Sequence, residues 1–267
     1  MSAFMSAALE LYALVLSPAL CYLIPAQVSF SDAWASFTLI GIIPCAFFYF
    51  MSFLYFLLDV FSSRSWIIAR KFQGASGVVA WKTYVHAFIT SVKSWFVGLS
   101  FTWLVSSRLG PLRGCPPVAA DWSAREFALH IIPFILIVDV VFYVTHRLLH
   151  TRMLYALVHK VHHSFSAPFA LAAVYAHPLE HLMSNVLSIS AGPLVLGSHP
   201  ITCGLWACVA IFSTTGAHSG FSFSHIKPAH DWHHESFTGN FGAGFGVLDA
   251  LLGTSCSKPL KGGRAMK

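Results

Sequence analysis

Long apolar stretches separated by short polar segments run along the first half of the chain. Residues 7–29, 37–61, 83–105 and 125–145 are each long enough to cross a hydrocarbon core of about 30 Å as a helix. Backbone groups in lipid must satisfy their own hydrogen bonds, and these continuous runs lack the short alternation of β-barrel strands. We therefore expect an all-α integral membrane protein with about four transmembrane helices.

The pattern changes in the second half. Residues 146–181 are polar, rich in histidine and helical in pattern, which predicts a helical layer at the membrane surface. A second apolar region, 182–215, is interrupted by Gly192-Pro193 and by Pro200, so each half has only about 16 residues, short for a span of roughly 20. This predicts an apolar helical hairpin that dips into or just crosses the bilayer. The polar tail, 218–267, is expected to complete a histidine-rich helical cap.

Composition agrees with a membrane protein, because 56% of the residues are hydrophobic and 10% are charged, against about 25% charged in soluble domains. The first basic residue is Arg64, so residues 7–29 lack the positive flank of a cleaved signal peptide and are interpreted as a retained span. The loop 62–82 has the densest basic cluster ahead of the histidines, and the positive-inside rule places it in the cytosol. Counting spans from there brings every dense histidine group to the cytosolic face.

The net charge of +6 is spread over the loops without a basic run, so we expect no nucleic-acid partner. The six cysteines are scattered and form no CxxC pair, which argues against a disulfide framework. No repeat or shift in composition divides the chain, so it is expected to form one structural unit.

The chemistry resides in the histidines. Three short motifs, HRLLH, HKVHH and HDWHH, place imidazoles at helix-compatible spacings, so each motif presents them on one side. At a frequency of 15 histidines in 267 residues, composition alone predicts about 0.05 copies of HxxHH, yet two occur. Clustered imidazoles suit transition metals. Eight imidazoles are more than one metal can hold, so we expect two metal ions to share them.

Other histidines differ in quality. His177 precedes Pro178 and is expected to cap a helix beside the hairpin, where the positive helix end keeps an imidazole neutral. His218 lies where the hairpin returns to the surface and is a good ligand candidate. His181 is either a ligand or a residue packed beside the ligands. Topology places three more outside the site: His86, His130 and His199.

Three carboxylates are candidates to support the site from outside the metal ligands. Asp139 lies two turns before His146 on the same helix face, inside an apolar span, where an ionisable residue is a functional hypothesis by default. Asp231 and Asp249 lie in and after HDWHH. Each is expected either to accept a hydrogen bond from a ligand imidazole or to form an ordinary salt bridge. Paired ExxH motifs and HExxH are absent, which disfavours a carboxylate-bridged di-iron bundle and a zincin protease.

Several motifs in order resemble the fatty acid hydroxylase superfamily, in its sterol desaturase branch. They are HRLLH, HKVHH, the segment YAHPLE, the turn His218-Ser219-Gly220, HDWHH and the closing LGT. The segment YAHPLEH with the later GPL is most similar to fatty-acid-hydroxylase-domain proteins and methylsterol monooxygenases. The resemblance covers roughly residues 135–255. It implies a catalytic region at 125–267, preceded by N-terminal membrane spans and loops at 1–124.

The resemblance also implies a chemistry. It implies two iron ions, replaceable by zinc on purification, with O2 and electrons from NAD(P)H delivered through a b-type cytochrome and its reductase. The protein would be a multi-pass membrane enzyme of the endoplasmic reticulum with its active site facing the cytosol. The metal ligands implied by residue matching are His146, His150, His159, His162, His163, His177, His218, His230, His233 and His234.

The substrate implied is a lipid. A C4-methylsterol is the first expectation, and a fatty acyl chain or sphingolipid hydroxylated by the same apparatus is the alternative. The interval between His218 and His230 is shorter than usual for the family, which is expected to affect substrate choice more than metal binding. A different class of function, a non-catalytic metal-handling membrane protein, would require metal-binding groups through the membrane depth. The few such groups within the apolar spans, Asp59, His130 and Asp139 among them, do not trace a path.

Overall fold

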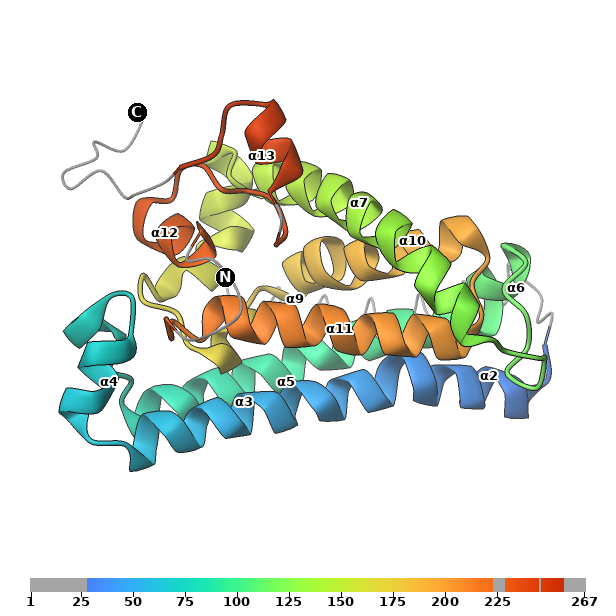
Figure 1. Cartoon of the computed structure of the whole chain (residues 1–267), viewed down its shortest axis with the longest axis horizontal. Coiled ribbons are helices and arrows are strands. Elements are labelled where there is room, and N and C mark those ends of the chain that lie inside the picture. Colours follow the sequence, from blue (N-terminus) through green and yellow to red (C-terminus); the bar gives the residue numbers. More distant parts are fainter. Residues whose placement is uncertain (1–27, 223–228, 245, 257–267) are drawn as a thin grey trace.

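A computed structural model describes residues 28–222, 229–244 and 246–256. Throughout this part of the chain the regular elements are helices, so the all-α prediction is confirmed (Figure 1). The predicted span 7–29 lies outside the described residues except for its last two positions. The five cysteines within the described part are all unpaired.

Two continuous helices and their short neighbours make up the first half. In chain order the elements are α2 (Phe30–Phe37), the π-helical turn η1 (Thr38–Ile42), α3 (Ile43–Phe61), α4 (Arg64–Arg70), the 3-10 turn η2 (Gly74–Gly77), α5 (Trp81–Leu104), the π-helical turn η3 (Val105–Leu109) and α6 (Gly110–Leu112).

The second half begins with the longest single α-helix and ends with the cap. In chain order the elements are α7 (Ala124–Leu149), α8 (Arg152–Leu154), η4 (Tyr155–His159), η5 (His162–Ser164), η6 (Ala170–Val174), α9 (Pro178–Glu180), η7 (His181–Val186), α10 (Leu187–Leu196), α11 (Pro200–His218), α12 (Ala229–Ser236) and α13 (Val247–Leu251).

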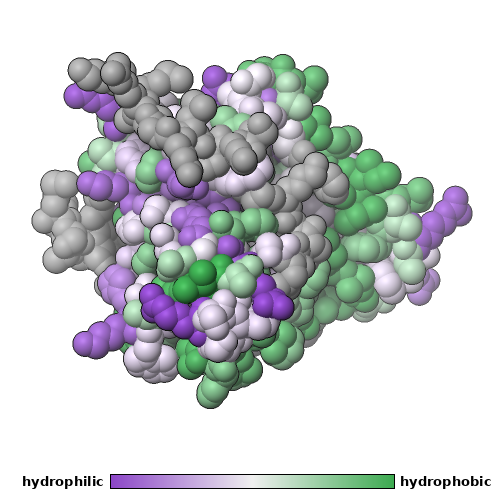
Figure 2. All heavy atoms as spheres, turned by 60° about the vertical axis from the view of Figure 1, so that its left-hand side comes forward, coloured by the Kyte–Doolittle hydropathy of each residue, from purple (hydrophilic) through white to green (hydrophobic). Residues whose placement is uncertain are grey.

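Four helical stretches are long and apolar enough to cross a membrane: Phe30–Phe61, Trp81–Leu112, Ala124–Leu149 and Pro200–His218. The first three contain three of the predicted spans, 37–61, 83–105 and 125–145, and extend each of them by several residues. Their outer faces are apolar, and Figure 2 shows this as green surface along the flanks, with purple patches gathered at the end that comes forward. That distribution is the one a lipid environment requires.

α10 and α11 form the predicted hairpin, but its second half is longer than expected. α10 ends at Gly197, whose φ of 62° is a left-handed helix cap. His199 then accepts a hydrogen bond from the Ile201 amide, and Pro200 occupies the first turn of α11. The proline therefore begins this helix, as its missing N–H allows. The expectation that neither half reaches the length of a span is wrong for α11, which has 19 residues.

Close packing ties the hairpin to α7. A Cβ added to Gly192 of α10 would lie 2.7 Å from Phe134 Cδ1 of α7, so the two backbones approach closely at this glycine. Trp206 of α11 packs on the same ring, with centroids 5.4 Å apart. Because α7 ends at the first histidine motif, this packing orients that motif relative to the hairpin.

A buried apolar core lies beneath the histidine-bearing segments. Phe48 of α3, Tyr84 of α5 and Ile211 of α11 surround Phe169 and η6, and all of these side chains are buried. Phe165 and Val161 pack against this core from the histidine-rich stretch. The core therefore holds the histidine-rich stretch in place at the ends of the spans.

The basic loop 62–82 and the histidines lie at the same end of the bundle, as α4 and α12 illustrate in Figure 1. Gln73 Nε2 donates to Asp231 Oδ2 of α12 over 2.9 Å, which joins the two regions directly. The expectation that loop and histidines share one face is confirmed for these residues.

Candidate metal centre

Nine of the ten histidines expected to bind metal come together, in two groups at the ends of the helices. A ring nitrogen from every member of a group lies within 4.8 Å of the others. The five-histidine group consists of His146, His150, His159, His163 and His233, and the four-histidine group consists of His162, His218, His230 and His234.

The two HxxHH motifs divide between the groups. His159 and His163 enter the five-histidine group, whereas His162 enters the four-histidine group. Successive residues of a helix point about 100° apart, while residues four apart share a face. The adjacent residues His162 and His163 therefore belong to two neighbouring groups. HDWHH divides in the same way, which makes α12 a bridge between the groups.

The Nε2 atoms of each group face one another. In the five-histidine group, His159 Nε2 lies 2.9 Å from His150 Nε2 and 3.0 Å from His163 Nε2. In the four-histidine group, His230 Nε2 lies 2.9 Å from His218 Nε2 and 3.2 Å from His234 Nε2. The relation among these atoms depends on where each ring carries its hydrogen.

The Nδ1 atoms answer that question, because most of them meet groups that only accept hydrogen bonds. The acceptors are Phe241 O for His146 (2.8 Å), Glu180 Oε1 for His159 (2.8 Å), Tyr175 O for His162 (3.3 Å), Thr214 O for His218 (2.8 Å), Gly239 O for His233 (2.7 Å) and Phe165 O for His234 (3.0 Å).

These contacts assign the hydrogen to Nδ1 and leave Nε2 with a bare lone pair. Where both rings are assigned, as for His146 and His159 (3.2 Å) or His162 and His218 (3.4 Å), the facing Nε2 lone pairs repel, because no hydrogen lies between them. A cation at the centre of each group converts that repulsion into coordination, and imidazole is a preferred ligand of iron and other transition metals. The donor set therefore fits two metal ions.

Burial keeps these imidazoles in the form that binds metal. Desolvation lowers the pKa of His162 to about 4 and, with the repulsion of His146 and His162, lowers the pKa of His150 to about 2. The pKa values of His230, His233 and His234 also lie well below the ordinary value, chiefly through burial. Neutral rings predominate near pH 7, as coordination through nitrogen requires.

His177 is the predicted ligand that joins neither group. Its Nδ1 accepts a hydrogen bond from the Leu179 amide over 3.2 Å, so it caps α9 as the sequence predicts. His181 is buried beside the site, and its Nδ1 lies 3.1 Å from the amide nitrogen of Asn185. His130 and His199 lie at the far end of the bundle, where His130 contacts Ser198.

None of the three predicted aspartates contacts a histidine ring. Asp231 accepts from Gln73, and Asp139 accepts from the Leu248 amide over 3.0 Å. Asp249 accepts from the amides of Phe241 (2.9 Å) and Gly242 (2.6 Å). Since His146 donates to the Phe241 carbonyl, Asp249 supports that ring indirectly, through the backbone of the loop. The expected direct contact between aspartate and imidazole is not found among the described residues.

Glu180 is the carboxylate that contacts a metal-group histidine, and the sequence reasoning did not select it. It is buried, and burial raises its pKa well above the usual value. Its Oε1 accepts from His159 Nδ1 at 2.8 Å. The signal was present in HPLEH, where a glutamate stands one residue before the buried His181, but linking it to His159 required the tertiary fold.

A large apolar cavity leads to both groups. Its volume is about 920 Å³, and its wall includes His146 and His159 of one group with His162, His218 and His230 of the other. The rest of the wall is mostly apolar and comes from α7, α10 and α11. Ligand pockets are commonly about 300–1,000 Å³. This cavity therefore has the size and polarity for a lipid.

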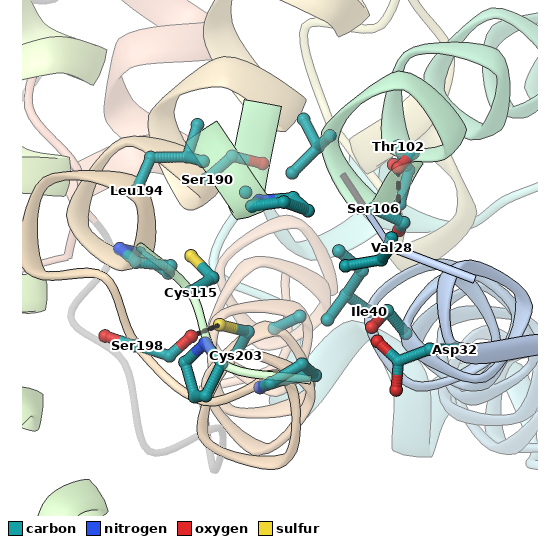
Figure 3. A pocket seen from close by; sticks show the side chains of 18 of the residues that line it. Val28, Asp32, Ile40, Thr102, Ser106, Cys115, Ser190, Leu194, Ser198 and Cys203 are labelled. Carbon is teal, nitrogen blue, oxygen red and sulfur yellow. Dashed lines mark hydrogen bonds between the residues drawn. The ribbon is translucent and has the colours of Figure 1, made fainter. Parts of the chain in front are cut away.

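A second pocket lies at the opposite end of the bundle, where α2, α6 and the tip of the hairpin meet (Figure 3). Ser106, Cys115 and Cys203 line it, and the Cys203 thiol points toward the Ser198 carbonyl. Its volume of about 60 Å³ leaves no room for a lipid. Of these two pockets, the large cavity is the one with room for a lipid.

Known proteins match this chain over the part that contains the histidine motifs. The family model for fatty acid hydroxylase matches residues 131–254. The chain is 42% identical over 135 residues to human fatty acid hydroxylase domain-containing protein 2, a match that covers 50% of this chain and 39% of that protein. It is 37% identical over 158 residues to methylsterol monooxygenase 2-2 of Arabidopsis thaliana, covering 54% of this chain and 57% of that protein.

A third relative is fatty acid hydroxylase ahd1 of Mycosarcoma maydis, 38% identical over 135 residues, which cover 50% of this chain and 35% of that protein. The matched part of the chain thus spans between about a third and three fifths of these relatives. No solved structure matches the chain. The resemblance predicted from the histidine motifs is confirmed: residues 131–254 belong to the fatty acid hydroxylase family.

Proposed function

We propose that this protein is a membrane di-iron monooxygenase that oxidises a sterol of the C4-methylsterol type. The observation that carries the proposal is the convergence of nine histidines in two groups, five of which line an apolar cavity of about 920 Å³. Two bound iron ions would supply reductive activation of O2 and oxidation of an unactivated C–H bond. The methylsterol monooxygenase among the relatives favours the sterol.

The chain's own residues hold and orient the ligands. Backbone carbonyls fix the rings of His146, His162 and His233 through Nδ1, and Glu180 fixes His159. These supporting contacts tune the metals and prevent the rings from rotating away.

The substrate reaches the site from the bilayer, between α7 and α11. Residues at helical spacing on α7 form an apolar stripe along the cavity that ends at His146: Ile131, Ile135, Val138 and Phe142. Opposite them, Val209 and Phe212 of α11 line the cavity while 45% and 43% exposed. The cavity wall is therefore continuous with the lipid-facing surface. A lipid can slide in without leaving hydrocarbon, which avoids the cost of hydrating it.

The cap faces the cytosol in this proposal, and the protein resides in the endoplasmic reticulum membrane. The support is the basic loop 62–82, which shares one end of the bundle with the histidines and is cytosolic by the positive-inside rule. If two irons are bound there, electrons would be supplied from NAD(P)H through a b-type cytochrome and its reductase. Residues 125–267 form the catalytic region, and 1–124 supply spans and loops that complete it.

A fatty acyl or sphingolipid hydroxylase is the second candidate, favoured by the fatty acid hydroxylase of M. maydis and by the same cavity. A non-catalytic metal transporter is disfavoured. Transport requires ligands at several depths of the membrane, whereas the two histidine groups in the described part of the chain lie together at one end.

Lipid profiles test the proposal and separate the substrates. Cells that lack the protein are compared with the same cells after it is restored, either unaltered or as His233→Ala. We expect 4-methylsterols to accumulate without the protein and to return to normal only with the unaltered chain. Unchanged sterols together with a loss of hydroxylated acyl chains would overturn the sterol proposal in favour of the second candidate.

Glu180 provides a more local prediction. Glu180→Leu removes the acceptor of His159 Nδ1, and loss of such a supporting contact costs about 10–100-fold in metal affinity. Glu180→Gln keeps an acceptor oxygen and should lose less. Competition with a chelator of known affinity measures both. Unaltered affinity in the leucine variant would show that His159 is oriented by something other than Glu180.

A further inference from the structure

Lys71 is a charged residue in an unusual place. It follows α4 at the histidine end of the bundle and is only 5% exposed. Its ammonium lies 3.0 Å from Asp59 Oδ1, donates to the Ser219 carbonyl over 2.6 Å and sits 3.9 Å from the centre of the Phe221 ring. An ammonium has three N–H groups, and Asp59, the Ser219 carbonyl and the Phe221 ring give it three partners. A buried ion pair is a weak source of stability, so its geometry is the more informative feature.

Two of the partners of Lys71, Ser219 and Phe221, belong to the turn that follows His218. The backbone of the same segment adds two hydrogen bonds to this turn, from the Phe72 amide to the Gly220 carbonyl (2.9 Å) and from the Ser222 amide to the Arg70 carbonyl (2.8 Å). Residues 220–222, which follow α11, thus pair with residues 70–72 as in a short antiparallel ladder. His218, the last residue of α11, stands directly before the paired turn.

Gly220 allows this approach. Its φ is +71°, a conformation that favours glycine, and a Cβ there would lie 3.3 Å from Lys71 Cδ. The lysine stem therefore packs against bare backbone. The close fit leaves the turn little freedom to shift while the lysine stays in place.

Gln73, two residues further on, makes a second connection. Its Nε2 donates to the Ser166 carbonyl over 2.7 Å and to Asp231 Oδ2 over 2.9 Å. Ser166 follows η5, which contains His162, and Asp231 lies beside His230. One short segment thus contacts three stretches of chain that bring ligands to the four-histidine group.

The segment is itself anchored to the membrane spans. Asp59 of α3 accepts a hydrogen bond from the Tyr84 hydroxyl of α5 as well as from Lys71. The chain of contacts runs from two spans through Asp59 and Lys71 to the turn after His218. All three of these residues, Asp59, Lys71 and Tyr84, precede the family match at 131–254.

We propose that Lys71 is a positioning residue for the four-histidine group. Its ammonium, held by Asp59, fixes the turn at Ser219 and so directs His218 toward His162 and His230. The N-terminal half of the chain would then complete one of the two metal sites without supplying a ligand. The inference rests on the metal occupancy of the proposed function, and the five-histidine group does not depend on Lys71.

Metal content tests the role independently of activity. The double variant Asp59→Asn with Lys71→Met removes both charges together, so no buried charge is left unpaired, while the asparagine can still contact Tyr84. Purified in detergent, loaded with Fe²⁺ and dialysed against a weak chelator, it should retain about half the iron of the unaltered protein. Retention of the full iron content in a folded double variant would overturn the proposal.

Lys82→Met is the matched control, because Lys82 is an exposed lysine in the first turn of α5, at the end of the basic loop 62–82. It should retain all its iron. If the double variant is not recovered folded, Lys71→Gln is measured in the same way; its neutral amide can still donate to the Ser219 carbonyl. We expect an iron content between those of the double variant and the unaltered protein, and full content would again overturn the proposal. Absence of bound iron in the unaltered protein would instead count against the proposed function.

Discussion

His162→Ala and His233→Ala should each abolish oxygen-dependent lipid turnover. Each substitution removes a ligand from a different histidine group, so neither variant can hold both metals. Loss of a residue that only supports a ligand costs roughly 10–100-fold, and loss of the ligand itself is expected to exceed about 100-fold in kcat/KM. Oxidation of the lipid by purified protein in nanodiscs, followed together with iron content, measures the effect.

His130→Gln is the matched control for these variants. His130 is a histidine of α7, like His146, but it contacts Ser198 at the far end of the bundle. It should keep its activity and both irons. The ligand variants should still insert in the membrane, because the apolar faces of the spans are untouched. Full activity in either ligand variant would refute the assignment of its histidine group.

The sequence predicted which histidines form this site better than it predicted how they are arranged. Spacing at i, i+3 and i+4 identified the motifs, because residues on one helix face must meet the same environment. Helix geometry separates His162 from His163, but which histidines of other motifs join each of them was not predictable, since that depends on the tertiary fold. The Nδ1 acceptors are mainly backbone carbonyls such as Phe241 O and Gly239 O. Every residue has a backbone carbonyl, so the sequence cannot show which carbonyl accepts from a histidine. Aspartate side chains were the acceptors that the sequence could indicate.

The fold shows the same division between local and distant information. Hydropathy located the spans because lipid demands an apolar surface whatever the tertiary contacts. In the sequence, Pro200 indicates an interruption of the apolar region, whereas its place in the first turn after His199 makes it the start of a span. The contacts of Lys71 and Gln73 with chain more than 90 residues away have no periodic signature at all.

Ala210→Trp is expected to block lipid oxidation while leaving the metals in place. Ala210 lies on α11 and lines the large cavity beside Val209, on the side where the wall opens to lipid. An indole there would occupy space that the substrate needs. Losing contact with only two methylene groups costs about 1.6 kcal/mol, which corresponds to more than about a tenfold loss in kcat/KM.

Cys208→Trp is the control, because it places the same indole on the same helix at a position that does not line the cavity. Lipid oxidation and iron content are measured for both variants in nanodiscs. Ala210→Trp should lose turnover at unchanged iron content, and a shorter lipid should be affected less than a full-length one. Cys208→Trp should resemble the unaltered protein. Equal turnover by the two variants would mean that the lipid does not pass between α7 and α11.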